Sequence, residues 1–200
     1  MKNLKQVKKH LGKGFTLIEL MITLVIAAIL MVVAIPNLTA FKRNAELTSA
    51  ANGLLGAINA ARSEAMKRGM YAMVVPMDGV SWNTNGLAVF VDKDGSRTYD
   101  NNRDQTVMTQ AVLPSYLSIS APTGVSAGAA TPYLMFDASG YPKTKSGGIG
   151  NQSLTLSRTD LSGTELYDQT RRLVIAPNGR VRICKPASAT DANCLASGSL

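Results

Sequence analysis

The sequence predicts an α+β protein in which one long N-terminal helix packs on an antiparallel β-sheet head domain. Two observations predict this class. Apolar residues follow a helical pattern from Phe15 to about Arg68, whereas short β-like runs separated by turn residues follow Gly69. A helix followed by a series of strands is the order expected of a single α+β domain.

A basic leader occupies residues 1–14, which hold five lysines and no acid. Removing the leader would lower the net charge from +8 to +3, because 16 basic residues would then face 13 acids. The one histidine, His10, also lies in this segment. A chain without the leader therefore has no histidine for a Ser-His catalytic pair or a His-ligated zinc site. We expect no enzyme activity, no catalytic residue and no cofactor.

An apolar stretch follows at residues 15–35 and contains one charged residue, Glu19. As a helix it would be about 30 Å long, which is enough to cross a bilayer. The basic leader would remain cytoplasmic and place the C-terminal bulk on the other side. A carboxylate inside such a span costs roughly 2.5–3.5 kcal/mol and usually pairs with another group. Glu19 is therefore either a functional pairing group or a chance acid near the membrane interface.

The segment Gly14 to Leu20, which reads Gly-Phe-Thr-Leu-Ile-Glu-Leu, resembles the class III signal of type IV pilins and type II secretion pseudopilins. The resemblance implies cleavage by prepilin peptidase between Gly14 and Phe15, with N-methylation of Phe15. It also implies that Glu19 pairs with the N-terminal amine of a subunit during assembly. The expected regions are a cleaved leader at 1–14, a transmembrane or fibre-core helix at 15–36, and a periplasmic or extracellular pilin head at 37–200.

The helix is expected to continue beyond Pro36 as an amphipathic segment. Proline removes a backbone donor and crowds the preceding turn, which predicts a kink there. The apolar side chains of this second half recur at helical spacing. They are Leu47, Ala51, Leu54, Leu55, Ile58, Ala61 and Ala65. A basic last turn ending at Arg68 and a glycine at position 69 favour a helix end at that point.

Eight short runs beyond Gly69 favour β-strands, and turn signals such as Pro177-Asn178-Gly179 separate several of them. The expected strands are Tyr71–Val75, Gly86–Val91, Thr106–Leu113, Tyr116–Ser120, Tyr133–Phe136, Ser153–Ser157, Arg172–Ala176 and Arg180–Cys184. Residues 121–131 are rich in Gly, Ala, Ser and Pro, which predicts a mobile loop. Trp82 is expected to anchor the core of the head domain.

Neither the acids nor the cysteines predict a metal site. Asp92 and Asp94, followed downstream by Asp100 and Asp104, faintly resemble a calcium loop, but an EF-hand loop needs acids at alternate positions over a longer run and a terminal glutamate. We therefore expect a polar turn. Cys184 and Cys194 are the two cysteines, and in a chain sent across a membrane such a pair favours a disulfide.

Three further segments carry a more specific resemblance. They are Asn59–Gly69, Trp82 with Gly86–Asp92, and Asn178–Cys184. Together they resemble the FimT/GspH group of minor pilins and pseudopilins. The last segment contains a Gly-Arg-X-Arg pattern at Gly179, Arg180, Val181 and Arg182. In FimT-type minor pilins this pattern is implicated in DNA binding during natural transformation.

The residues around Gly179 themselves predict a basic hairpin. Pro177 presets φ at the first turn position, and Gly179 takes the left-handed bulge position. In the strand that follows, Arg180 and Arg182 share one face about 7 Å apart, which matches the spacing of phosphates along a nucleic-acid strand. A solvated strand face with no ligand remains the alternative.

No acid occurs between positions 168 and 191, so further basic residues could widen this patch. They are Arg171, Arg172 and Lys185. Because no aromatic residue lies within the patch, we expect sequence-independent contacts with the nucleic-acid backbone.

The resemblance and the basic hairpin together predict a minor pilin that helps to assemble a type IV pilus and binds DNA for uptake in natural transformation. The alternative is a structural priming subunit without DNA binding, in a type IV pilus or a type II secretion pseudopilus. The implied partners are other pilin subunits, prepilin peptidase, the inner membrane and DNA. The implied location is a Gram-negative inner membrane, with one membrane pass and a periplasmic head, and then the fibre.

Overall fold

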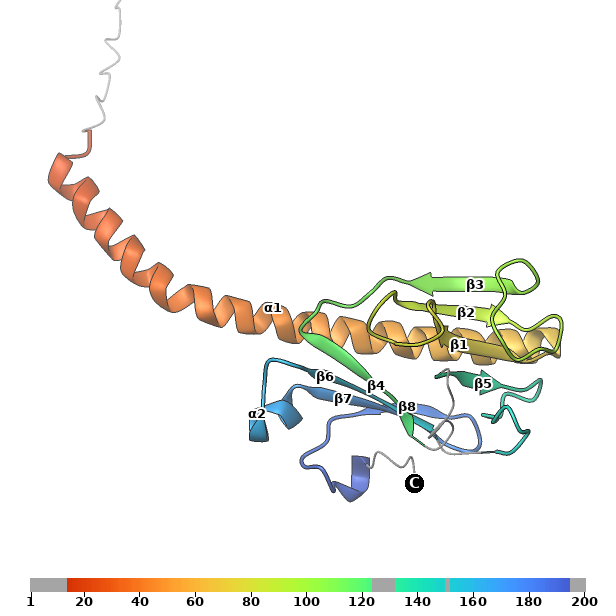
Figure 1. The fold of residues 1–200 in the computed structure, drawn as a ribbon. Coiled ribbons are helices and arrows are strands. Elements are labelled where there is room, and N and C mark those ends of the chain that lie inside the picture. The colour runs from red at the N-terminus through yellow and green to blue at the C-terminus, as the bar shows by residue number, and fades with distance from the viewer. Residues whose placement is uncertain (1–13, 124–131, 150–151, 195–200) are drawn as a thin grey trace, which may run out of the picture. The chain divides into compact units, whose positions relative to one another are not determined.

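The computed structural model of the chain describes residues 14–123, 132–149 and 152–194 (Figure 1). The predicted leader therefore lies almost entirely outside the described residues. The chain divides into two compact units, one up to Arg43 and one from Asn44 onward. Helix α1 (Leu17–Arg68) contributes residues to both units.

In the first unit, α1 begins directly after Thr16. The hydroxyl of Thr16 accepts a hydrogen bond from the backbone N–H of Glu19 at 3.2 Å, which is the arrangement of a helix N-cap. The apolar side chains here are largely exposed, as at Phe15, Leu24 and Ile29.

Within the described residues, no single helix is both long and apolar enough to cross a membrane. Two helical segments, Leu17–Val32 and Asn37–Arg68, meet that requirement together, and a bend separates them. The bend lies where the sequence predicts a kink at Pro36.

In the second unit, α1 buries one apolar face, as the helical pattern predicts. The fully or nearly fully buried side chains are Leu47, Ala50, Ala51, Leu54, Ala57, Ile58, Ala61 and Ala65. The backbone N–H groups of Gly69 and Met70 both donate to the Ala65 carbonyl, at 2.9 and 3.3 Å. Gly69 has a φ of +67°, so this glycine ends the helix as expected.

Within the described residues, eight strands form two antiparallel four-stranded sheets, in agreement with the predicted α+β class of a helix packed on antiparallel β-structure. The first sheet has the order β3-β2-β1-β5 and the second has the order β4-β6-β7-β8. The strands are β1 (Ala72–Pro76), β2 (Leu87–Val91), β3 (Gln105–Gln110), β4 (Leu117–Thr123), β5 (Leu134–Phe136), β6 (Gln152–Arg158), β7 (Thr170–Ile175) and β8 (Val181–Cys184).

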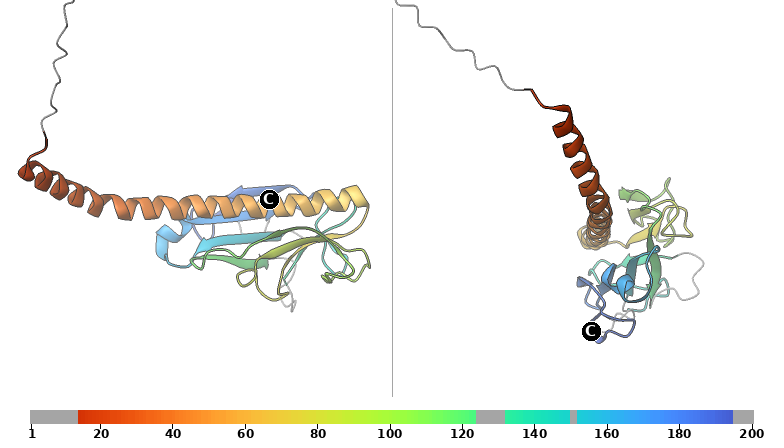
Figure 2. Two further views of the ribbon diagram at one scale, coloured as in Figure 1. Left: turned by 90° about the horizontal axis from the view of Figure 1, so that it is seen from above. Right: turned by 90° about the vertical axis from the view of Figure 1, so that its left-hand side faces the viewer.

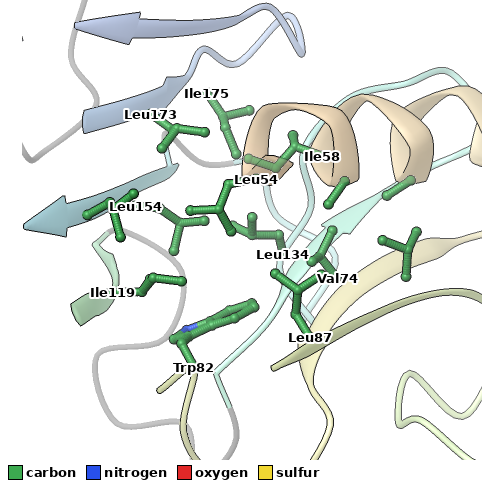
Figure 3. Close-up of a cluster of buried hydrophobic side chains, with 14 of the residues drawn as sticks. Leu54, Ile58, Val74, Trp82, Leu87, Ile119, Leu134, Leu154, Leu173 and Ile175 are labelled. Carbon is green, nitrogen blue, oxygen red and sulfur yellow. The ribbon is translucent and has the colours of Figure 1, made fainter. Parts of the chain in front are cut away.

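The main core lies where α1 and both sheets meet (Figure 3). Leu54 and Ile58 of α1 face side chains of both sheets, including Leu134 of β5 and Ile175 of β7. Trp82 is 3% exposed and joins this cluster, so it anchors the core as predicted. A second, smaller cluster contains Met73, Val75, Ala88, Phe90, Tyr133 and Met135.

All eight predicted strands are present, with ends that differ by a few residues. β4 continues to Thr123, into the segment 121–131 expected to be a loop, and the rest of that segment lies outside the described residues. The sequence analysis missed two short helices, α2 (Gly163–Asp168) and the 3₁₀ helix η1 (Ala192–Cys194). Figure 2 shows the head from two further sides, with α2 next to the start of β7.

Candidate nucleic-acid interface

The β7–β8 hairpin carries the Gly-Arg-X-Arg residues at one edge of the second sheet. β8 pairs with β7 and is the last strand in the described sheet order. In the register of this pair, Val181 lies opposite Ile175 and Ile183 lies opposite Leu173. Val181 and Ile183 pack against the main core, whose members Leu173 and Ile175 are fully buried.

The predicted turn connects the two strands. The N–H of Gly179 donates to the Ala176 carbonyl at 2.8 Å, and the N–H of Ala176 donates to the Arg180 carbonyl at 2.9 Å. Gly179 has a φ of +78°, a conformation in which a Cβ atom would be strained. The structure thus confirms the turn and moves the start of the strand from Arg180 to Val181.

Helix α1 fixes this turn through Arg62, a residue that the sequence analysis did not assign to the site. Its Nε donates to the Gly140 carbonyl at 3.1 Å, and its Nη2 donates to the Asn178 carbonyl at 3.4 Å. Gly179 packs so closely on the Gly140 carbonyl that an added Cβ would overlap it. Since these residues are far apart in the sequence, no local pattern signals the contact.

Arg182 projects from the face of the sheet opposite to the main core. It lies across from Val174 in the register, and its two neighbours in β8 point into the core. Arg180 lies at the end of the turn and is exposed, whereas Arg182 is partly buried. The predicted alternation is therefore present for Val181, Arg182 and Ile183, whereas Arg180 precedes β8.

The guanidinium groups of Arg180 and Arg182 have no hydrogen-bond acceptor or ion-pair partner within the described part of the chain. The Nε of Arg182 is moreover a buried donor without an acceptor there. Other arginines of the head are engaged, as Arg158 is by Asp160 at 2.5 Å and Arg68 by Glu64 at 2.5 Å. Arg180 and Arg182 thus retain donors and charge for an external anion.

Arg172 does not widen this surface, contrary to the sequence-based expectation. It is 7% exposed, its Nε donates to Thr155 Oγ1 at 3.2 Å, and its Nη1 donates to the Cys194 carbonyl. Burial lowers the pKa of its guanidinium. Its position opposite Cys184 places it under the C-terminal segment.

Arg171 and Lys185 are also engaged within the chain. Arg171 donates to the backbone carbonyls of Asp168 and Thr170 at 3.0 and 2.9 Å. Lys185 pairs with the Asp168 carboxylate at 2.7 Å. Both side chains therefore contact residues in or next to α2. Of the five basic residues in this part of the sequence, Arg180 and Arg182 are the two whose side chains have no partner within the described residues.

Cys184 and Cys194 form the predicted disulfide, with their Cα atoms 5.9 Å apart. Within the loop that it closes, Asp191 accepts hydrogen bonds from the N–H groups of Ala187 and Asn193 at 2.9 and 3.0 Å. The Ala187 N–H, with the Asn193 N–H and the charge of Arg172, holds the pKa of Asp191 below its usual range. The disulfide and these bonds hold the segment against the end of β8.

At the other end of the described chain, Gly14 is exposed and precedes α1. Phe15 is 82% exposed, and Glu19 lies in the first turn of the helix, where a carboxylate complements the helix dipole. Gly14, Phe15 and Glu19 are thus accessible in this conformation.

Comparisons with known proteins identify the family. A family model described as type II transport protein GspH matches residues 50–179, and a model of the prokaryotic N-terminal methylation motif matches residues 11–35. The first match ends at Gly179, so it does not include Arg180 and Arg182. No curated protein is significantly similar in sequence to this chain.

Solved structures that match this chain include a minor pilin and a minor pseudopilin. The type IV minor pilin FimU of Pseudomonas aeruginosa is 22% identical, with a TM-score of 0.49 over 72% of this chain and 92% of its own. The minor pseudopilin EpsH from the type 2 secretion system of Vibrio cholerae is 16% identical, with a TM-score of 0.47 over 72% of this chain and 99% of its own.

The GspH family model covers well over half of the chain, from the buried face of α1 to the turn before β8, and the methylation motif covers the start of α1. The chain therefore belongs to the GspH family and is a type IV minor pilin or pseudopilin of the FimT/GspH group.

Proposed function

We propose that this subunit is a minor pilin of a type IV pilus whose head binds DNA through Arg180 and Arg182, for uptake in natural transformation. The observation that carries the proposal is the absence of any acceptor for these two guanidinium groups within the described residues. Arginines that only stabilise a fold normally find a carbonyl or a carboxylate, as Arg62 and Arg158 do. Unpaired donors on an edge strand suit a phosphate backbone.

Two arginines make a small contact, which limits the affinity of one head. Each phosphate neutralised contributes about −0.7 to −0.9 to the slope of log K against log salt concentration, so two contacts give about −1.4 to −1.8. Binding should not depend on base sequence, because contacts with phosphates carry no sequence information. Several heads, or partners in the fibre, would be needed for strong capture.

The test is a gel-shift and fluorescence-anisotropy titration of the full-length mature chain in detergent micelles with double-stranded DNA. Replacing Arg180 and Arg182 by Gln should weaken binding at least about tenfold and flatten the salt slope. A control with the same loss of charge replaces Lys67 and Arg103, whose side chains are 73% and 70% exposed. If the two double variants weakened DNA binding equally, the loss would come from the change in net charge, and Arg180 and Arg182 would not form the DNA-binding site.

The same proposal includes the processing and anchoring of the chain. Prepilin peptidase cuts between Gly14 and Phe15, the new N-terminus is methylated, and residues 15–36 lie in the inner membrane and then in the fibre core. The methylation motif matched at residues 11–35 supports this assignment. Glu19 pairs with the amine of a subunit during assembly. Mass spectrometry of the mature chain should find N-methylphenylalanine at position 15.

The name of the matched family supports a second candidate, a pseudopilin that primes a type II secretion pseudopilus. A chromosomal variant with Arg180 and Arg182 replaced by Gln separates the two. If the subunit is a DNA-binding pilin, cells that carry this variant should lose transformation but keep piliation and secretion. If it is a priming subunit, the same cells should keep all three, whereas cells that lack the gene should lose fibre assembly or secretion.

A further inference from the structure

Three aspartates from the two ends of the β2–β3 loop meet in space. Asp92 follows the last residue of β2, Asp94 lies in the turn after it, and Asp104 directly precedes β3. One carboxylate oxygen of each lies within 4.8 Å of the other two. Asp92 is 2% exposed and Asp104 is 9% exposed, so two of the three charges are withdrawn from water.

The carboxylate of Asp92 has an orphaned oxygen. Its Oδ2 accepts a hydrogen bond from the Arg97 N–H at 3.0 Å, but its Oδ1 is buried and accepts none from the described residues. Asp104 is better satisfied, because its oxygens accept from the N–H groups of Lys93 and Asp100 at 3.1 and 2.8 Å. A buried carboxylate oxygen without a donor is costly and normally indicates a missing partner.

The surrounding cations do not supply that partner. Within the described residues, neither Asp92 nor Asp104 takes part in an ion pair, and Arg103 reaches the outer Asp94 at 3.6 Å. Lys145 acts on Asp92 only at longer range, with its ammonium 5.0 Å from the centre of the Tyr133 ring. The guanidinium of Arg97 donates to the Lys145 carbonyl. The cluster therefore combines three close carboxylates with little compensating charge.

We propose that Asp92, Asp94 and Asp104 bind a calcium ion that joins the two ends of the β2–β3 loop. The donor set consists of carboxylate oxygens without histidine or cysteine, which favours a hard cation over zinc or copper. Oxygens of one Ca²⁺ shell lie about 2.3–2.6 Å from the ion, and their separations then match the spacing of this cluster. Ca²⁺ accepts irregular geometry and water ligands, whereas Mg²⁺ requires a nearly ideal octahedron.

The arrangement of the acids in this site differs from that in an EF-hand loop. Asp104 approaches Asp92 because β2 and β3 pair as neighbours, with Val91 opposite Gln105. The acids therefore come from both ends of a long loop instead of alternate positions of one segment. The strand pairing supplies a ligand that linear spacing cannot indicate.

The test is calorimetric titration of the full-length mature chain in detergent micelles with CaCl₂ after treatment with EDTA, together with thermal unfolding. We expect a dissociation constant of about 0.1–1 mM, as in extracellular calcium modules. The midpoint Tm should rise by about 3–7 °C in 10 mM CaCl₂ and by less in 10 mM MgCl₂. Absence of both the binding heat and the shift in Tm overturns the proposal.

Variants assign the ion to this cluster. Asp92→Asn and Asp94→Asn should each abolish the calcium-dependent rise in Tm, and the partly exposed Asp94 provides a readout even if Asp92→Asn fails to fold. Asp168→Asn, whose side chain is 69% exposed on α2, should keep the full response. A calcium response retained in Asp94→Asn would place the ion outside this cluster and overturn the proposal. It would also be overturned if Lys145→Gln lowered the stability while calcium had no effect on that variant or on the native chain, because Lys145 would then supply the compensating charge.

Discussion

Arg172 of β7 donates a hydrogen bond to the backbone carbonyl of Cys194, so a buried guanidinium holds the C-terminal segment on the outer face of the second sheet. A buried cation needs such acceptors, because removing a charge from water is costly unless hydrogen bonds replace the solvent. In turn, the carbonyl of Cys194 obtains a hydrogen-bond donor from Arg172. The arginine that the sequence assigned to a ligand surface therefore stabilises the fold.

Replacing Arg172 by Gln should lower the stability of the head and loosen its C-terminal segment. The shorter side chain cannot reach both Thr155 and Cys194, and an orphaned buried carbonyl costs about 1–3 kcal/mol. Circular dichroism should show a Tm lower by about 2–10 °C. Hydrogen exchange of residues 187–194 should accelerate. Arg180→Gln, at a side chain without a partner, should change the free energy of unfolding by less than about 0.5 kcal/mol.

Replacing Cys184 and Cys194 together by Ser should destabilise the head without changing its main core. The disulfide spans 10 residues of sequence, and closing so short a loop contributes about 2–3 kcal/mol. The Tm should fall by about 4–12 °C, while the far-ultraviolet circular dichroism at 20 °C keeps its native shape. An unchanged Tm would mean that the hydrogen bonds of Arg172 and Asp191 suffice to hold the segment.

Most of the fold could be predicted because its signals are local. The stripe from Leu47 to Ala65 has helical spacing, Gly69 has the conformation of a helix stop, and each strand is a short β-like run bounded by turn residues. Division into two sheets depends on which strands pair across long intervals, as β1 does with β5. No local pattern encodes that pairing, so the sequence predicted the strands without their partners.

In the candidate interface, the pattern of charges in the sequence does not show which basic side chains are buried or paired in the fold. Five basic residues near the C-terminus look equivalent in the sequence. The fold buries Arg172 under the C-terminal segment, engages Arg171 and Lys185 around Asp168, and leaves Arg180 and Arg182 unpaired. Only alternation along β8 and the turn at Gly179 were encoded locally. The contact of Arg62 with the turn required the tertiary structure.

The C-terminal segment should open in acid through protonation of Asp191. The folded-state pKa of Asp191 is depressed, chiefly by the Ala187 N–H, below an unfolded value of about 3.9. Its contribution is therefore fully present above that unfolded value and is lost as the pH falls through the folded pKa. Hydrogen exchange at Ala187 and Asn193, corrected for intrinsic rates, should show protection lost below about pH 4.

Asp191→Asn provides the matched comparison, because other carboxylates of the head also titrate in acid. The variant should be less stable than the native chain at pH 7, and the difference in stability should shrink as the pH falls below about 4. A difference that stays constant between pH 7 and pH 3 would mean that the charge of Asp191 does not support the segment.

Gly179 should tolerate no side chain, for two reasons that act together. Its φ of +78° disfavours any residue with a Cβ, and an added Cβ would overlap the Gly140 carbonyl that Arg62 also contacts. Gly179→Ala should therefore lower the free energy of unfolding by about 1–3 kcal/mol and displace the turn, which would weaken DNA binding even though both arginines remain.

Gly56→Ala is the control, because a Cβ there meets nothing within 4 Å and the site is inside α1. That change should stabilise the head by about 0.5–1 kcal/mol and leave DNA binding unchanged. Equal stability of the two variants would show that the turn adapts and that its contact with Gly140 does not position Arg180.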